Sequence, residues 1–172
     1  MFEKGEFIMY GSSGVCQIEE IGPMEMSGAK VGKLYYTLLP VYTNGSKIFT
    51  PVDNTKIVMR KIMTKQEAMD AVIEIPEIEP LWIEDEKKRQ ELYKETLRAC
   101  TFEGYIKVIK TLFLRQQSRL ENGKRLATVD ERYLKMAQDG LYGELAISLS
   151  MDKEDVVNFI TEQIEGGEKV LL

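Results

Sequence analysis

The chain has 172 residues, a length that allows one ordinary domain or two small ones and excludes a large multidomain enzyme. Hydrophobic residues make up 44% and charged residues 30%, as in a soluble globular protein rather than a disordered one. The sequence has no histidine, which excludes Ser-His-Asp and Cys-His catalytic pairs and histidine-containing zinc sites. Cys16 and Cys100 are far apart and lack metal-binding spacing, so we expect reduced thiols, no metal and no cofactor.

The charge is unevenly distributed along the chain. The net charge is −5, but residues 82–135 carry 13 Lys and Arg against 9 Asp and Glu, whereas residues 1–81 and 136–172 are both acidic. Only the middle segment is expected to attract a polyanion. No apolar run approaches the roughly 20 residues of a membrane span, and the N-terminus lacks the apolar core of a signal peptide. We therefore expect a cytoplasmic protein.

The first 61 residues have the pattern of a small β domain. Short runs rich in β-branched and aromatic residues alternate with glycine-containing turns. Asn44-Gly45 is the strongest turn signal and predicts a two-residue hairpin turn, whereas Gly11-Ser12-Ser13-Gly14 lacks the Walker spacing and predicts a plain turn. The predicted strands are Glu6–Tyr10, Val15–Ile21, Lys33–Val41, Lys47–Pro51 and Ile57–Lys61. Such a series is typical of a small antiparallel barrel or sandwich.

From Thr64 onward the hydrophobic period becomes helical. Thr64 and Glu67 have the spacing of a capping box, and the proline-marked loop 76–80 is the expected domain boundary. We expect Leu92, Thr96 and Ala99 to face inward on the second helix. The predicted helices are 64–74, 84–98, 102–121, 128–150 and 152–164. The fold class is therefore α+β, with domain 1–61, a helix and linker over 62–80, and a compact all-α domain over 81–172.

The acidic clusters of the chain have a structural explanation. Glu84-Asp85-Glu86 and the acids at positions 152, 154 and 155 fall in the first turns of predicted helices, where they complement the helix dipole. No glycine-punctuated calcium loop surrounds either cluster. We therefore expect neither a catalytic pair nor a metal site, and we expect that the protein is not an enzyme.

Trp82, the only tryptophan, directly precedes a basic helix. It has two possible roles. A buried Trp82 would be a packing bridge or hydrophobic staple. An exposed Trp82 beside basic residues would be a wedge that unstacks a DNA base step. Basic residues follow it that could contact phosphates: Lys87, Lys88, Arg89, Lys124 and Arg125.

Several segments together resemble one family. They are FEKGEFIMYGSSGVCQIEEI near the N-terminus, NGSKIFTPVDN at 44–54, the Trp before a basic helix, IKVIKTLFLR at 106–115 and LYGELA at 141–146. In order, spacing and total length the chain resembles the CarD family of bacterial transcription regulators, also called CdnL, over about residues 1–160.

The resemblance implies a fold and two partners. The N-terminal domain would be a Tudor-like β barrel that binds the β subunit of RNA polymerase, and the helical domain would bind promoter DNA at the upstream edge of the bubble with weak sequence preference. By resemblance Trp82 would be the wedge and Lys87, Lys88 and Arg89 the phosphate contacts. The polymerase surface would include Met24, Glu25, Lys47, Phe49 and Pro51.

The chain departs from the family pattern in two places. Met24 and Phe49 stand where family members carry Arg, and an apolar side chain cannot pair with acids. The spacing from Trp82 to the following helix is also about one helical turn longer than in the family.

From the resemblance as a whole we expect a transcription regulator that stabilises the open complex. The alternative is a protein–protein adaptor whose helical domain does not touch DNA, and the low net basicity favours it.

Overall fold

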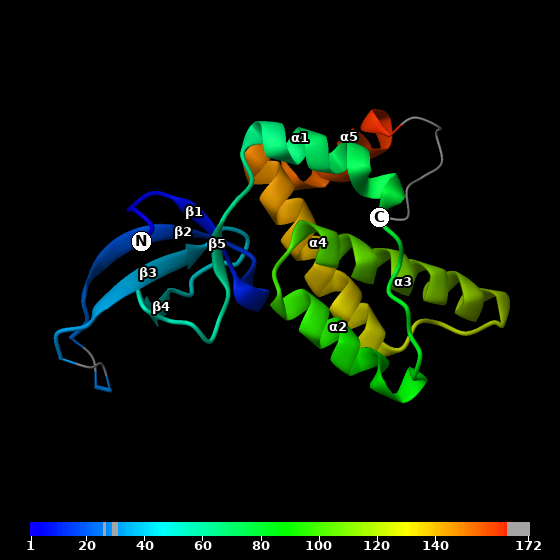
Figure 1. The fold of residues 1–172 in the computed structure, drawn as a ribbon, viewed down its shortest axis with the longest axis horizontal. Coiled ribbons are helices and arrows are strands. Elements are labelled where there is room, and N and C mark those ends of the chain that lie inside the picture. Colours follow the sequence, from blue (N-terminus) through cyan, green and yellow to red (C-terminus); the bar gives the residue numbers. More distant parts are fainter. Residues whose placement is uncertain (26, 29–30, 165–172) are drawn as a thin grey trace.

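The computed structural model describes residues 1–25, 27–28 and 31–164. It has the predicted α+β class: a five-stranded antiparallel sheet is followed by five α-helices over the described residues. Figure 1 shows the sheet at one end of the molecule and the helices at the other. The strands are β1 (Phe7–Tyr10), β2 (Val15–Pro23), β3 (Leu34–Pro40), β4 (Ile48–Pro51) and β5 (Met59–Lys61).

The sheet has the order β4-β3-β2-β1-β5 and is open. Its central hairpin is long, with β2 pairing β3 from Cys16 opposite Pro40 to Pro23 opposite Leu34 and one irregularity between Ile18 and Glu20. The edge strands β4 and β5 are not paired with each other within the described residues. The hydrogen bonds therefore form a sheet and do not close a barrel.

Strand β1 is buried on both faces. Ile8 and Tyr10 belong to a small core within the β domain, together with Ile18, Tyr36 and Leu38. Met9 instead joins the core of the helices, as does Val15 at the start of β2. Because side chains alternate along a strand, this short segment joins two cores.

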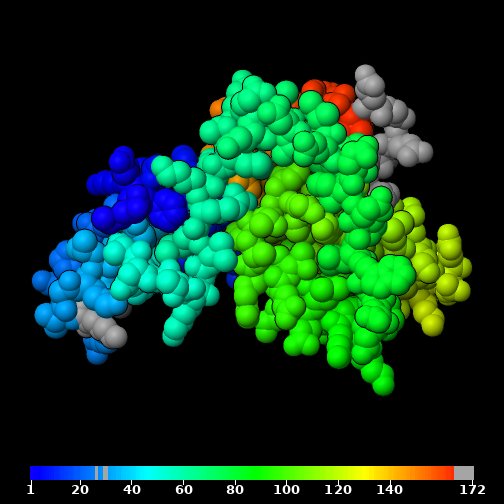
Figure 2. Space-filling model, in the orientation of Figure 1, coloured from blue at the N-terminus to red at the C-terminus, as the bar shows by residue number. Residues whose placement is uncertain are grey.

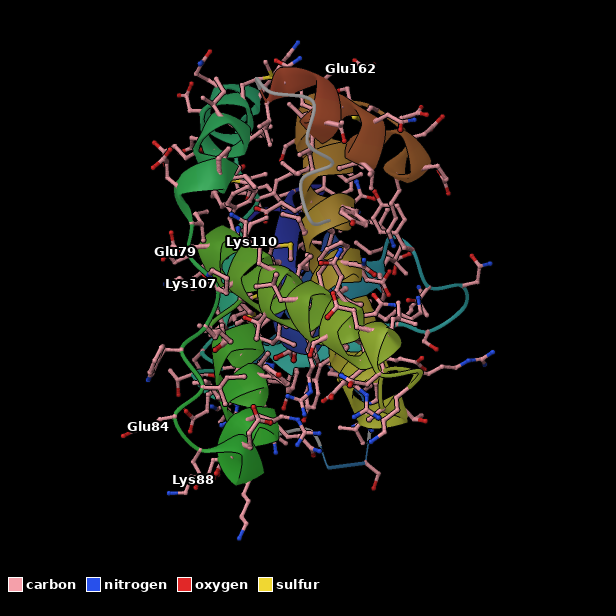
Figure 3. All side chains as sticks on the ribbon, turned by 90° about the vertical axis from the view of Figure 1, so that its right-hand side faces the viewer. Glu79, Glu84, Lys88, Lys107, Lys110 and Glu162 are labelled. Carbon is pink, nitrogen blue, oxygen red and sulfur yellow. The ribbon has the colours of Figure 1, made fainter. Side chains whose placement is uncertain are left out.

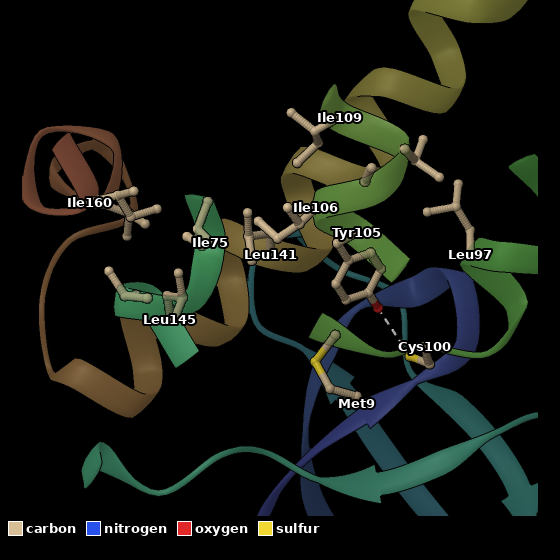
Figure 4. Packing of buried hydrophobic residues seen from close by; sticks show 14 of the residues in the cluster. Met9, Ile75, Leu97, Cys100, Tyr105, Ile106, Ile109, Leu141, Leu145 and Ile160 are labelled. Carbon is tan, nitrogen blue, oxygen red and sulfur yellow. Dashed lines mark hydrogen bonds between the residues drawn. The ribbon is translucent and has the colours of Figure 1, made fainter. Parts of the chain in front are cut away.

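The helices form one larger core. They are α1 (Lys65–Glu74), α2 (Arg89–Arg98), α3 (Phe102–Glu121), α4 (Thr128–Leu149) and α5 (Val156–Gln163). Short 3₁₀ turns lie at Ile75–Glu77, Glu86–Lys88 and Lys153–Asp155. Ile106 and Leu141 lie at the centre (Figure 4), and Ile75 from the end of α1 and Ile160 from α5 are fully buried in the same cluster. Helix α1 thus packs with the helices that follow the proline loop.

Several hydrogen bonds join the sheet to the helices. Arg60 of β5 forms a two-pronged ion pair with Glu144 of α4, at 2.5 and 2.7 Å, and its Nε donates to the carbonyl of Cys100 at 2.6 Å. The other Glu144 contact comes from the Met63 amide, at 3.0 Å. Glu144 is fully buried. Charged hydrogen bonds of this kind have strict geometry, so they fix how the sheet sits on α4.

Two glycines of α4 allow close packing. A Cβ at Gly140 would lie 2.7 Å from Cζ of the buried Tyr105, and one at Gly143 would lie 2.9 Å from Cε2 of Tyr42. Tyr42 also donates a hydrogen bond to the Gly143 carbonyl, at 3.2 Å. These positions are where an aromatic ring from another element meets the helix.

Three local predictions are wrong. Helix α2 begins at Arg89 rather than Glu84, and it buries Tyr93 and Leu97 while Ala99 is exposed. Strand β3 ends at Pro40 and β4 begins at Ile48, so Gly45 lies in a longer loop and not in a two-residue turn. These differences arise because tertiary packing chooses the buried face of a helix and the length of a loop.

Candidate interaction surfaces

The exposed face of the β domain brings together most of the predicted polymerase contacts. In the sheet register Phe49 of β4 lies opposite Thr37 of β3, which lies opposite Glu20 of β2. Pro51 lies opposite Tyr35 in the next row on the same face. A shallow hollow on this face is lined by Met24, Glu25 and Phe49, among others. Phe49 is 43% exposed, so this face presents an apolar side chain at a position where the resemblance leads one to expect an arginine.

Lys47 differs from the other predicted polymerase contacts because it forms an ion pair. Its Nζ lies 2.6 Å from Glu19 Oε2, and both side chains are substantially exposed. An exposed pair of this kind contributes little to stability. Lys47 thus lies directly before β4, and its charge is paired with that of Glu19.

Trp82 is exposed. Its side chain is 85% accessible, whereas its neighbours Leu81 and Ile83 pack against the helical core. Of the two arrangements that the sequence leaves open, the structure has the exposed one. An exposed indole beside charged residues is suited to stacking on, or wedging between, flat groups.

Four of the predicted phosphate contacts are exposed cations. Lys87 and Lys88 lie in the turn before α2, and Lys124 and Arg125 lie in the loop between α3 and α4. Within the described part of the chain, none of these four side chains forms an ion pair. Figure 3 shows Lys88 near the outer edge of the molecule.

Arg89 lies differently, since its guanidinium turns inward. Its Nη2 is 3.4 Å from Oδ2 of Asp130, which is fully buried at the start of α4. Arg115 of α3 contacts the same carboxylate at 3.2 Å and Glu86 at 2.8 Å. This cluster holds the start of α2 against the start of α4, and with it the two exposed basic segments, Lys87-Lys88 and Lys124-Arg125. This cluster could not be predicted from the sequence, because Asp130 has the pattern of an ordinary acid in a first helical turn.

The surroundings of Trp82 are not uniformly basic. A hollow beside the indole is lined by Lys88 and Arg89 but also by four acids: Glu84, Asp85, Glu91 and Glu95. These acidic side chains would repel a polyanion bound beside the indole and so weaken its attraction to Lys88. The Trp82 side of α2 thus differs in charge from the Lys124 loop.

Neither cysteine is placed for reactivity. Cys16 and Cys100 are both fully buried, as predicted for Cys16, and burial raises the pKa of Cys16 to about 12. Burial also raises the pKa of Cys100, whose Sγ lies 3.1 Å from the Tyr105 hydroxyl (Figure 4). Both thiols are therefore neutral at physiological pH. Among the residues described, no group of three potential ligand side chains gathers as a metal site would require.

The comparisons with known proteins identify the β domain. Residues 2–63 match the family model described as the CarD-like/TRCF RID domain. This match is consistent with a CarD-type N-terminal domain. The match contains the whole five-stranded sheet and ends just before α1, so the helices lie outside it. The comparison with curated proteins found no match.

The RID domain indicates a transcription-related function with RNA polymerase as the partner. Its exposed β2-β3-β4 face is the surface on which the predicted contacts gather. None of the helices in the described ranges has both the length and the apolar composition needed to cross a bilayer.

Proposed function

We propose that this protein regulates transcription initiation by binding RNA polymerase and promoter DNA at the same time. In this proposal the RID domain binds the β subunit of polymerase, and the helical domain from residue 81 onward binds DNA. The protein acts through binding and not as an enzyme, in keeping with a sequence that has no histidine. The polymerase partner is supported by the family match, and the β subunit by the resemblance to CarD proteins. The Tudor-like character of the β domain, which the resemblance implies, belongs to the same proposal.

One observation carries the DNA half of the proposal. Trp82 is 85% exposed on the helical domain, in the extended segment between α1 and α2 that runs on the side of the helices away from the sheet (Figure 1). Lys87 and Lys88 follow it and are free to contact phosphates. An apolar wedge with adjacent cations matches the way proteins open base steps from the minor groove. The Arg89 guanidinium instead contacts the buried Asp130 carboxylate, so we do not assign a phosphate contact to Arg89.

The mechanism follows from linkage. A protein that contacts polymerase and DNA together, and contacts melted DNA better than the closed duplex, shifts the equilibrium toward the open complex. A difference of about 1.4 kcal/mol between the two states shifts that equilibrium about tenfold. Because Trp82 can stack only where bases are unstacked, it supplies the difference, while the lysines contribute to both states.

A titration of fluorescent fork-junction DNA at several salt concentrations tests this proposal. Wild-type protein should bind, and the double variant Lys87→Ala, Lys88→Ala should reduce the slope of log affinity against log salt by about two, or about one per lysine. The matched control is Lys4→Ala with Lys65→Ala, which removes the same charge from exposed sites on the β domain and α1. Equal slopes for the two double variants would remove Lys87 and Lys88 from the DNA surface.

The adaptor alternative rests on the four acids that line the hollow beside Trp82. In that case the indole would insert into a protein pocket, and the helical domain would not touch DNA. The same titration with and without polymerase separates the two functions. Wild-type protein that binds fork-junction DNA in neither condition, while still binding polymerase, would favour the adaptor.

A further inference from the structure

Residues 75–85, which we call the Trp82 segment, are tied to α3 at two points. The first tie is a buried lysine. Lys110 is only 7% exposed, and its Nζ donates to the carbonyls of Ile75 and Ile78, at 2.6 and 2.7 Å. Burying an ammonium group is costly unless acceptors surround it, so these two bonds are specific. Figure 3 shows Lys110 on α3 beside the segment that carries Glu79.

The second tie lies directly before the tryptophan. The amide of Leu81 donates to Oγ1 of Thr111, at 2.8 Å, and the same hydroxyl donates to the carbonyl of Lys107, at 2.6 Å. Thr111 is 8% exposed. Because the hydroxyl proton is engaged with Lys107, the oxygen lone pair is directed at the Leu81 amide, which fixes one backbone position next to Trp82.

The pattern of burial makes Trp82 point outward. Leu81 and Ile83 pack against the helical core, and Trp82 between them is exposed. The backbone is extended at Ile78 and Asp85, the two ends of this stretch. In extended chain, neighbouring side chains point to opposite sides. A slip of one residue would bury the indole, but it would expose two apolar side chains and break the Leu81–Thr111 bond.

The other end of the segment is also fixed. The Asp85 side chain accepts from the Lys87 amide at 2.9 Å and begins the 3₁₀ turn that leads into α2. Trp82 therefore lies between a capped 3₁₀ turn and the backbone bond of Leu81 to Thr111. Trp82 is thus exposed although the backbone on both sides of it is held in place by hydrogen bonds.

We propose that Thr111 and Lys110 are positioning residues that hold the Trp82 indole ready for its partner. This inference rests on the proposed function, since it assigns the partner as melted DNA. With the ties in place, binding need not order the segment; without them, the cost of ordering it is subtracted from affinity. Neither residue touches the partner, and both act through the placement of Trp82.

The free protein provides a direct test, because Trp82 is the only tryptophan. Thr111→Val keeps the side-chain shape and removes the acceptor, and Thr111→Ser keeps the acceptor. We expect Thr111→Val and Lys110→Met to add fast local motion to the time-resolved fluorescence anisotropy of Trp82 and to speed hydrogen exchange at the Leu81 amide. Thr111→Ser should remain close to wild type. Thr161→Val is the matched control, since among the described residues Thr161 bonds only to the Val157 carbonyl, within α5.

A double-mutant comparison then connects position to binding. Thr111→Val should weaken fork-junction binding roughly three- to tenfold in the wild-type background, the range expected for ordering one segment. It should have no effect in the Trp82→Ala background. Unchanged anisotropy and exchange in Thr111→Val would overturn the inference, as would an equal loss of binding in both backgrounds. If Trp82→Ala binds as well as wild type, the wedge itself fails, and the anisotropy still shows whether the tie exists.

Discussion

Glu144 is a buried charge on which two parts of the molecule depend. It receives two bonds from Arg60 and one from the Met63 amide, while its own side chain is fully buried. Arg60 is 27% exposed and so retains some solvent. Removing one partner of such a pair leaves the other charge without compensation, which costs far more than an exposed salt bridge would.

We therefore predict that Glu144→Gln lowers the free energy of unfolding by about 3 kcal/mol. The measurement is urea unfolding followed by circular dichroism. Glu121→Gln, at the exposed end of α3, is the control and should change stability by less than about 0.5 kcal/mol. Similar stabilities for the two variants would mean that the Arg60 pair does not join the sheet to the helices.

Single residues also show what a sequence cannot predict. The local sequence around Trp82 and Arg89 is equally compatible with a buried indole and with an outward guanidinium. Alternation says that Leu81 and Trp82 face opposite sides, but only the position of Thr111 on α3 decides which one faces the core. Arg89 turns inward because Asp130, 41 residues later, is buried within reach. Both outcomes depend on contacts between distant segments.

At the scale of elements, the local signals were sufficient for most boundaries. The capping box of Thr64 and Glu67 forms as predicted, and α3 spans the predicted residues. The buried face of α2 was predicted wrongly because Leu92–Thr96 and Tyr93–Leu97 are both spaced as a helical stripe. The structure buries the second pair in the helical core, where the Tyr93 ring lies 5.7 Å from the Tyr133 ring of α4. Periodicity identifies a helix but does not choose between adjacent stripes.

Helix α4 illustrates how one element serves two packing contacts. Alanine is favoured over glycine in a helix by about 1 kcal/mol. Gly140→Ala should nevertheless destabilise the protein by about 1 to 3 kcal/mol, because its Cβ would overlap the ring of buried Tyr105. Gly143→Ala should be closer to neutral, because Tyr42 is 42% exposed and can turn away; the gain in helix propensity then offsets the lost hydrogen bond to the Gly143 carbonyl.

Thermal unfolding of the two variants checks this prediction. The contrast between them is the result that matters, since both carry the same substitution three residues apart in one helix. A Gly140→Ala variant with a melting temperature at or above that of wild type would show that Tyr105 does not limit the approach of α3 to α4.

At the scale of the whole molecule, the sheet and the helices share buried structure. Met9 and Val15 of the RID domain lie in the helical core, and the Arg60–Glu144 pair crosses the same boundary. The space-filling view shows the two parts in broad contact (Figure 2). The β2-β3-β4 face and Trp82 are therefore held at a fixed separation. For a protein that bridges two partners, such rigidity removes part of the entropic cost of the second contact.

The central claim is that one molecule binds polymerase and grips the melted promoter through Trp82. The most direct test is the lifetime of promoter open complexes after a competitor challenge, measured with no added protein, with wild type and with Trp82→Ala. We predict that wild type lengthens the lifetime and that Trp82→Ala, although it still binds polymerase, loses most of that effect. Equal lifetimes with wild type and Trp82→Ala would contradict the account.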